Sequence, residues 1–395
     1  MNNFIYHSPT KMIFENDAEN HAGEFVKAFG AKKVLIHYGS GSVIRSGLLN
    51  RVEASLTNEG IAYVTLGGVI PNPLLSKVHE GIELCKKEKV DFILAVGGGS
   101  TIDSAKAIGM GLCYDGEVWD FFDGTTTPKG SIPIACVLTM AAAGSEMSNS
   151  CVITNDVTLL KRYAGHEEAI CKFALMNPSL TITLPDYQTA CGCVDIIMHT
   201  FERYFNTTTN MDITDEMAEG VLRSVIKNAK ILKKNPSNLE ARWNIMWASS
   251  LSHNGLTGCG TLGGDWSTHD IEHELGGMYN VAHGAGLAAV WGSWARYVLD
   301  VIPHRFAKMA TKVLGIATQE NERATALLGI EAMEDFFRSL DMPTNLPDLG
   351  IVVTEANIDE MAEKATHYGK KVLGRGSNAL HKADVITILT NANKA

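Results

Sequence analysis

Short apolar stretches alternate with segments of helical periodicity through the first part of the chain. Apolar runs that predict buried strands cover 34–38, 62–68, 91–97 and 131–139, and helical patterns follow to about residue 58 and over 74–90 and 101–112. Alternation of this kind is typical of a parallel sheet covered by helices. Residues 4–14, with Ser8-Pro9 in the middle, alternate between apolar and polar and predict a short hairpin before this sheet.

After about Pro185 the strand patterns nearly vanish, and long segments repeat their apolar residues with a period close to 3.6. We therefore expect an N-terminal α/β domain over 1–184 and a C-terminal all-helical domain over 185–395. A chain of 395 residues is long enough for two domains, because single cores stop growing near about 250–300 residues. The predicted helices of the second domain cover 187–206, 212–234, 238–254, 284–299, 303–314, 320–340 and 355–367.

Composition excludes several classes of partner. The formal net charge is −10, and an acidic surface attracts neither nucleic acid nor an anionic membrane. No apolar run approaches the roughly 18 residues of a membrane span. The first residues show no basic start followed by an apolar core, and the eight cysteines have no disulfide-like spacing. These features predict a cytoplasmic protein with reduced thiols.

Two glycine turns follow predicted strands. The first, Gly39-Ser-Gly-Ser42, lacks the third glycine of a dinucleotide fingerprint and is a weak motif. The second, Gly97-Gly-Gly-Ser100, ends a strongly apolar strand and opens a helix. Glycines let the backbone approach a diphosphate, and a helix N-terminus offers free N–H groups to it. The second turn therefore indicates a nucleotide site, although a tight turn without a ligand would look the same.

One carboxylate and several histidines gather in two stretches of the helical half. Asp195 and His199 are four residues apart, as are His269 and His273, so each pair lies on one helix face. His283 follows shortly after. Imidazoles with a single carboxylate suit Zn²⁺ or Fe²⁺ better than Mg²⁺ or Ca²⁺, which prefer oxygen ligands. Spacing alone leaves both a metal site and ordinary polar helix faces open.

Four motifs make the chain resemble the iron-containing alcohol dehydrogenase family, particularly its branch of butanol dehydrogenases and broad-specificity NADPH-dependent aldehyde reductases. They are VGGGSTIDSAK at 96–106, GSE at 144–146, CVDIIMHTFERYF from Cys193, and HDIEHELGGMYNVAHGAG from His269. The likeness extends over nearly the whole chain, from SPTKMIFE to KADVITIL. It implies a Rossmann-like domain followed by a helical domain, the architecture of dehydroquinate synthase.

The resemblance also implies roles for individual residues. Asp195, His199, His269 and His283 occupy the positions of the four metal ligands, for Fe²⁺ or Zn²⁺, and His273 becomes the candidate for proton relay. The positions that would contact the nicotinamide cofactor are Gly39, Gly41, Ser42, Asn72, Gly98, Gly99, Ser100, Asp103, Thr139, Ser148, Lys161 and Thr181.

Family resemblance implies an oxidoreductase that moves hydride between NAD(P)(H) and a small primary alcohol or aldehyde, such as butanol or butyraldehyde. The alternatives are a glycerol-dehydrogenase-like or dehydroquinate-synthase-like metal enzyme on the same fold, and a metal-binding protein without catalysis. No basic cluster for a phosphorylated substrate surrounds the histidines. Because the turn from Tyr38 to Arg45 holds no acid to repel a 2′-phosphate, we expect NADP(H) to be favoured and NAD(H) to be accepted. A homodimer is also expected.

Overall fold

The computed structural model describes residues 1–374 and 379–394, which form two compact units. One unit is Ser8–Leu184, and the other is Pro185–Ala395 together with Met1–His7. The first residues join the helical unit because the Met1 ammonium donates to the Thr209 carbonyl at 2.7 Å and the Asn2 N–H to the Gly260 carbonyl at 2.9 Å. The boundary after Leu184 coincides with the change of periodicity in the sequence.

The first unit is built on a parallel sheet of six strands in the order β1-β8-β5-β4-β2-β3. The strands are β1 (Lys11–Phe14), β2 (Lys33–Tyr38), β3 (Ala62–Leu66), β4 (Phe92–Gly97), β5 (Ile134–Leu138) and β8 (Phe173–Met176). A separate antiparallel pair joins β6 (Ser150–Thr154) to β7 (Lys161–Gly165). The parallel α/β sheet predicted from the alternating pattern is confirmed.

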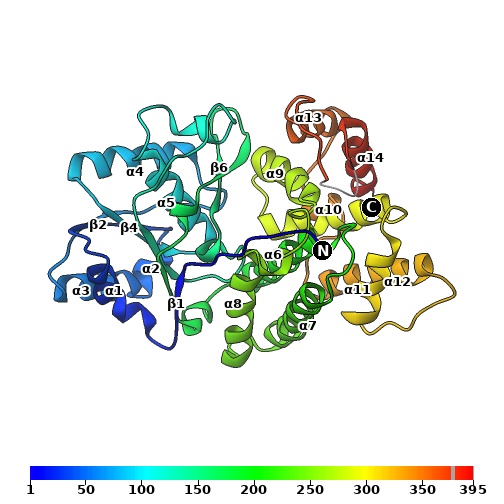
Figure 1. The fold of residues 1–395 in the computed structure, drawn as a ribbon, viewed down its shortest axis with the longest axis horizontal. Helices are drawn as coiled ribbons and strands as arrows, with labels where there is room; N and C mark the ends of the chain where they lie inside the picture. Colours follow the sequence, from blue (N-terminus) through cyan, green and yellow to red (C-terminus); the bar gives the residue numbers. More distant parts are fainter. Residues whose placement is uncertain (375–378, 395) are drawn as a thin grey trace. The chain divides into compact units, whose positions relative to one another are not determined.

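Helices cover both faces of this sheet, with α1 and α3 on one side of β2 and β4 and α4 and α5 on the other (Figure 1). Their bounds are α1 (Ala22–Ala28), α2 (Ser42–Arg45), α3 (Leu48–Asn58), α4 (Leu75–Glu88) and α5 (Gly99–Gly111). Alternate residues of the strands, such as Val34 and Ile36 of β2, pack with Val52 and Leu56 of α3 in one buried cluster. Since both faces of the sheet are buried, the strands are largely apolar, and this is why apolar runs in the sequence predict them.

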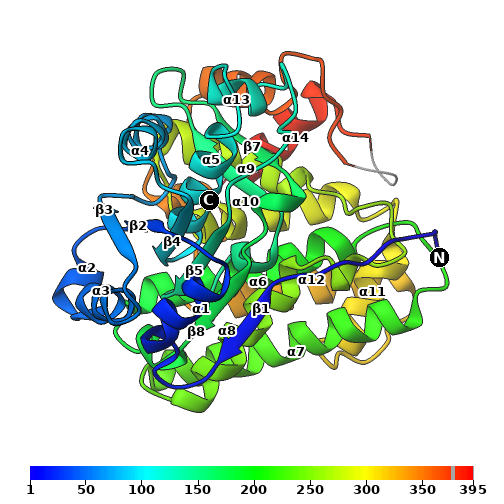
Figure 2. The same ribbon diagram turned by 60° about the vertical axis from the view of Figure 1, so that its left-hand side comes forward.

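The second unit is helical. It contains α6 (Asp186–Tyr204), α7 (Asp212–Lys234), α8 (Leu239–His253), α9 (Ser267–Tyr279), α10 (His283–Val298), α11 (Pro303–Lys312), α12 (Glu322–Ser339), α13 (Glu355–Ala365) and α14 (Lys382–Ala392). From Ala190 to Tyr204 every residue of α6 is buried, so this helix runs through the centre of the unit. Figure 2 shows α6 with α7 and α8 on one side and α9 and α10 on the other. Within the described residues, no helix has the length and apolarity to cross a membrane.

The predicted hairpin over residues 4–14 is wrong. Only Lys11–Phe14 forms a strand there, and it pairs in parallel with β8, with Lys11 opposite Phe173. Alternation of apolar residues specifies a half-buried strand but not its partner, and the partner here is more than a hundred residues away in the sequence. The structure also has β6, β7, β8 and α14, which the sequence patterns did not predict.

Candidate metal and nucleotide site

Three helices of the second unit bring four side chains together. Asp195 and His199 come from α6, His269 from α9 and His283 from the first position of α10. Each offers one ligand atom, and these atoms all lie within 4.8 Å of one another. The Asp195 Oδ1 atom lies 3.3 Å from Nε2 of His199, 3.8 Å from Nε2 of His269 and 3.6 Å from Nε2 of His283. The residues singled out by their spacing therefore converge on one point.

The polar atoms at this point fit a divalent cation. Asp195 and His269 are both 4% exposed, and neither Oδ1 of Asp195 nor Nε2 of His269 has a hydrogen-bond partner. Buried polar atoms without partners cost free energy unless something else satisfies them. Three imidazole nitrogens and one carboxylate oxygen form a donor set that suits Zn²⁺ or Fe²⁺. The site thus has the ligand chemistry that a first-row metal requires.

Two buried glutamates orient the outer nitrogens of these histidines, and sequence analysis missed both. Glu202 Oε1 lies 2.8 Å from Nδ1 of His269, and Glu272 Oε2 contacts Nδ1 of His283. A carboxylate on the outer nitrogen fixes the tautomer of a metal-binding histidine and raises its basicity. The available signal was positional, because Glu202 and Glu272 each follow a ligand histidine by three residues.

Glu202 also fixes the start of α9. Its Oε1 accepts the backbone N–H of His269 at 3.1 Å, and its Oε2 accepts that of Trp266. These N–H groups belong to the first turn of a helix, where they have no partner within the helix, and a carboxylate there also interacts well with the helix dipole. One side chain of α6 therefore sets both the position of α9 and the ring orientation of His269.

The metal-free cluster holds its histidines in different protonation states. Burial lowers the pKa of His199 well below its ordinary value, and the nearby His253, His269, Arg203 and His283 lower it further. For His269, burial lowers the pKa, but the interactions of its ring with the Asp195 and Glu202 carboxylates outweigh burial and raise the pKa to about 9. His199 is therefore neutral and ready to bind a cation, whereas His269 must first lose a proton.

His273 lies beside this cluster without being part of it. It is on α9, one turn after His269, and is 8% exposed. Its ring centroid is 6.0 Å from that of His283. The four-residue group within 4.8 Å does not include it. The structure therefore separates His273 from the convergent set, as the family resemblance implied.

In the first unit, both glycine turns lie at the carboxyl ends of parallel strands. Gly39, Gly41 and Ser42 follow β2, and Gly41 precedes the first residue of α2. Gly98 precedes α5 immediately after β4, and Gly99 and Ser100 are its first residues. The two strands are neighbours in the sheet. Ligands of open α/β sheets bind at this end of the strands, and a helix N-terminus there suits a diphosphate.

Asp103 and Lys106 of α5 hold the loop that begins with the GSE motif at 144–146. Asp103 accepts hydrogen bonds from the Ser145 hydroxyl at 2.6 Å and from the Val152 N–H at 2.9 Å. The fully buried Lys106 ammonium donates to the carbonyls of Ser145, Ser148 and Ser150 at 2.7 to 2.9 Å. Asp103 thus braces this loop, and its expected contact with the cofactor stays a prediction.

The remaining expected cofactor residues are spread over neighbouring loops of the same unit. The Thr139 N–H bonds the Gly97 carbonyl at 3.0 Å, and Asn72 is buried with a left-handed φ of 54°. Ser148, Lys161 and Thr181 are also buried, and the Thr181 hydroxyl donates to the Pro178 carbonyl at 2.7 Å. Their placement leaves a role in cofactor binding as a prediction.

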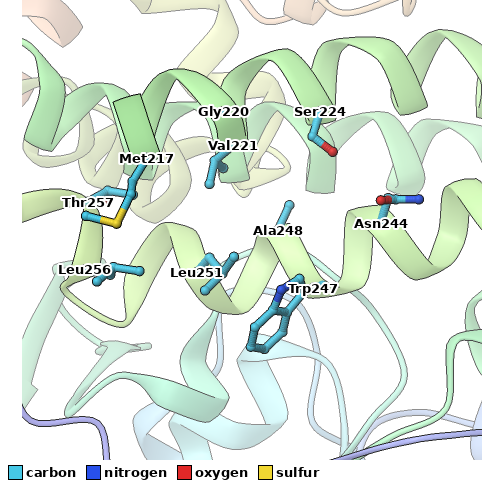
Figure 3. A pocket seen from close by; sticks show the side chains of 10 residues that line it. All are labelled: Met217, Gly220, Val221, Ser224, Asn244, Trp247, Ala248, Leu251, Leu256 and Thr257. Carbon is cyan, nitrogen blue, oxygen red and sulfur yellow. The ribbon is translucent and has the colours of Figure 1, made fainter. Parts of the chain in front are cut away.

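A cavity of about 270 Å³ lies elsewhere in the helical unit, between α7 and α8 (Figure 3). Apolar side chains such as Val221, Trp247 and Leu251 line it, and its lining includes no histidine, cysteine or carboxylate. Without such groups it has neither metal ligands nor proton donors, so we do not assign the chemistry to it.

A parallel sheet with glycine turns at its strand ends, followed by a helical unit with an Asp-His₃ cluster, is the arrangement expected of a nicotinamide-dependent enzyme with a metal site. Two family models match the chain: "Iron-containing alcohol dehydrogenase" over residues 9–178, and "Fe-containing alcohol dehydrogenase family, C-terminal" over 189–393. The chain belongs to the iron-containing alcohol dehydrogenase family and is an NAD(P)-dependent alcohol dehydrogenase. This decides against the lyase-like and non-catalytic alternatives.

Individual relatives align over their full length. NADH-dependent butanol dehydrogenase A of Clostridium acetobutylicum is 39% identical over 98% of this chain and 99% of its own. The NADPH-dependent aldehyde reductase YqhD of Escherichia coli is 35% identical over 95% of each chain. The crystal structure of NADH-dependent butanol dehydrogenase A from Thermotoga maritima has a TM-score of 0.96 at 40% identity and covers 100% of this chain and 99% of that one.

Proposed function

We propose that the protein interconverts a small primary alcohol and its aldehyde, of the size of butanol and butyraldehyde, using a nicotinamide cofactor. The observation that carries the proposal is the convergence of Asp195, His199, His269 and His283 in a chain of the alcohol dehydrogenase family. The relatives support the substrate class, since they are named as butanol dehydrogenases and an aldehyde reductase.

The four converging side chains are the proposed ligands of Fe²⁺ or Zn²⁺. When bound, such a metal supplies a Lewis acid for the substrate oxygen, which favours the alkoxide of an alcohol and polarises the carbonyl of an aldehyde. A bound nicotinamide would accept hydride from the alcohol carbon or return it to the aldehyde carbon, and the alcohol hydroxyl would give up one proton in the oxidative direction. Glu202 and Glu272 keep the imidazoles of His269 and His283 oriented towards Asp195.

His273 is our candidate for the group that receives this proton. Its ring centroid lies 6.0 Å from that of the proposed ligand His283, so it stands beside the proposed metal site without belonging to the ligand group. Imidazole is the side chain whose ordinary pKa is best placed to exchange protons near neutral pH.

NADP(H) is proposed as the favoured cofactor, with NAD(H) also accepted. The turn after β2 contains no carboxylate that would repel a 2′-phosphate. Arg45 adds a cation at this turn, because a Cβ atom placed on Gly41 would be only 2.5 Å from Nη1 of Arg45. The relatives include proteins named for NADH and one named for NADPH, which is consistent with acceptance of both.

One experiment tests the function as a whole. Protein stripped of metal is reloaded anaerobically with Fe²⁺ or Zn²⁺ and assayed on a series of aliphatic aldehydes with NADPH and with NADH. We expect metal-dependent turnover, with a larger kcat/KM for NADPH, and Asp195→Ala is the matched inactive control. Turnover that does not depend on metal would overturn the ligand assignment, and a tenfold advantage for NADH would overturn the cofactor preference. Ser42→Asp should move the ratio towards NADH.

A homodimer in the cytoplasm is the assembly and location that we propose. Strand β1 lies at the edge of the sheet, and the segment before it exposes apolar side chains, with Phe4 52% and Ile5 97% exposed. An unpaired edge strand and exposed apolar residues both favour association. The eight cysteines are free, as expected in a reducing compartment. Light scattering on wild type and on Ile5→Asp tests the dimer.

A further inference from the structure

The three proposed ligand histidines are not held in the same way. His269 and His283 each have a glutamate on the outer nitrogen, Glu202 at 2.8 Å and Glu272 respectively. His199 is 5% exposed and directs Nε2 towards Asp195, but its Nδ1 atom is buried and has no hydrogen-bond partner. Most metal-binding histidines donate this outer N–H to a carboxylate, a carbonyl or water. No protein group hydrogen-bonds this nitrogen, so on the protein side it is packing that orients the His199 ring.

Three rings lie against His199: that of the proposed ligand His269, at 4.5 Å between centroids, and two from outside the ligand group. The ring centroid of His253, the last residue of α8, lies 4.0 Å from that of His199, with an angle of 56° between the planes. Trp266, just before α9, lies 5.8 Å from His199 and meets it edge-on. His253 is the nearest of the three, so the position of its ring limits how far the His199 ring can turn.

Arg203 fixes the His253 ring. Its Nη2 lies 3.3 Å from Nδ1 of His253, and since a guanidinium only donates, that nitrogen is the acceptor and the tautomer is determined. Nη1 donates to the carbonyls of His199 at 2.8 Å and Ser252 at 3.1 Å. The guanidinium also lies 4.6 Å from the Trp266 ring centroid. Arg203 thus ties the backbone of His199 to the residue before His253 and to the ring that packs on it.

We propose that His253 and Arg203 are positioning residues for the metal ligand His199. His253 replaces the missing hydrogen-bonded anchor with ring packing, and Arg203 keeps that ring in place. Neither residue is in the convergent ligand group, and both contact His199 directly. The inference rests on the metal site of the proposed function, and it adds an element that the other two ligand histidines do not have.

Metal affinity tests this without relying on turnover. Zn²⁺ affinity is measured by competition with a chelator for wild type, His253→Ala, Arg203→Met and the double variant. We expect each single change to weaken binding by about 10–100-fold, the usual effect of losing an outer-shell partner. Because both residues act on the same ring, their effects should not add. The double variant should bind Zn²⁺ no more than about threefold more weakly than the single variant that binds it less tightly. Co²⁺-loaded His253→Ala should also show shifted visible absorption bands.

Control variants keep the outcome interpretable. His304→Ala removes another histidine of the same unit, an exposed one on α11, and should leave both affinity and spectrum unchanged. His253→Phe preserves the ring but cannot accept from Arg203, so it should fold and still bind Zn²⁺ more weakly than wild type. Wild-type affinity in His253→Ala, or fully additive losses in the double variant, would overturn the positioning role. Full metal occupancy in Asp195→Ala would instead overturn the metal site itself.

Discussion

Single atoms distinguish the histidines of the metal cluster from one another. The Nε2 atoms of His199, His269 and His283 lie 3.3 to 3.8 Å from one carboxylate oxygen, whereas His273 lies outside this group although it is only one turn from His269. Side chains at i and i+4 share a helix face, so sequence spacing alone cannot tell a ligand from its neighbour. We propose that this neighbour, His273, exchanges a proton with the substrate, because its ring lies 6.0 Å from that of the proposed ligand His283.

If His273 relays a proton but does not bind the metal, a variant of it should lose turnover and keep its metal. His273→Ala should keep its metal, because none of the four ligands is removed. Turnover should fall by about 10²–10⁴-fold, the usual contribution of a general acid or base. Metal content by elemental analysis and kcat on one aldehyde measure the two quantities, and His304→Ala serves as the control. Loss of metal would assign His273 to the ligand set, and unchanged turnover would reduce it to a packing residue.

His269 leads to a prediction about pH. Its pKa in the metal-free site is raised to about 9, so at pH 7 the imidazole carries a proton that must leave before a metal binds. Binding of Zn²⁺ at pH 7 should therefore release about one proton from this site, and its apparent affinity should fall by about tenfold per pH unit on acidification. Titration calorimetry in buffers of different ionisation enthalpy measures the release, and Glu202→Gln should reduce it.

The raised pKa of His269 also affects the stability of the metal-free protein. Metal affinity should rise with pH, whereas this contribution to stability should fall. A folded-state pKa above the unfolded value stabilises the fold fully below about pH 6.5, and this contribution is lost as the pH rises through about 9. Denaturant unfolding of metal-free protein at pH 6 and pH 9.5 should show it. A metal-free protein whose stability does not decrease between these values would contradict the assigned protonation.

Sequence predicted the ligands but not the residues that support them. Asp195, His199, His269 and His283 follow from residue type, helical spacing and family motifs. Glu202 and Glu272 look in the sequence like ordinary charged helix residues, and His253 stands some distance from every motif. Their contacts depend on how α6, α8, α9 and α10 cross, and this crossing is set by side-chain packing that a single sequence does not reveal.

At the scale of elements, the metal cluster depends on close contact between α6 and α10. Gly284, next to the ligand His283, lies so near α6 that an added Cβ would be 2.1 Å from the Cys191 carbonyl oxygen. A backbone atom cannot move aside as a flexible side chain can, so α10 would have to shift and carry His283 with it.

Gly284→Ala should therefore weaken Zn²⁺ binding by at least about tenfold and destabilise the protein by about 1–3 kcal/mol, the usual cost of overpacking. Gly220→Ala is the matched control, because it lies within α7 and its added Cβ would meet nothing within 4 Å. That control should be neutral or slightly stabilising, as is usual for Gly to Ala within a helix. Chelator competition and denaturant unfolding of both variants test the contrast, and equal behaviour would contradict it.

Elements were predictable where local patterns are strong. The helices from α6 to α8 and from α10 to α13 lie where 3.6-residue periodicity predicts them, usually within two residues at each end. β1 was misread as part of a hairpin because its partner β8 is distant in the sequence. The sequence pattern does not predict the short strands β6 and β7, since five residues beside a loop give little periodicity.

At the scale of the whole molecule, the two proposed binding functions occupy separate units. All four proposed metal ligands belong to Pro185–Ala395, and all the expected nucleotide contacts belong to Ser8–Leu184. Each unit has its own buried core, which explains why the change of periodicity near residue 185 was visible in the sequence. A substitution in the binding site of one unit should therefore leave ligand binding by the other unit unchanged.

Binding of the two ligands should accordingly be separable. Asp195→Ala should lose its metal but bind NADPH within about threefold of wild type, measured by the fluorescence of the nucleotide. Gly99→Val should do the reverse, because a bulky side chain at the start of α5 blocks the approach of a diphosphate to the helix N-terminus. An alanine-sized Cβ there would be 3.5 Å from the Ala143 Cβ atom, an ordinary contact, so the turn itself is not crowded at that position. Zn²⁺ affinity of Gly99→Val should match wild type. If either variant lost both ligands while remaining folded, the two sites would have to share residues, and the assignment of each site to one unit would be wrong.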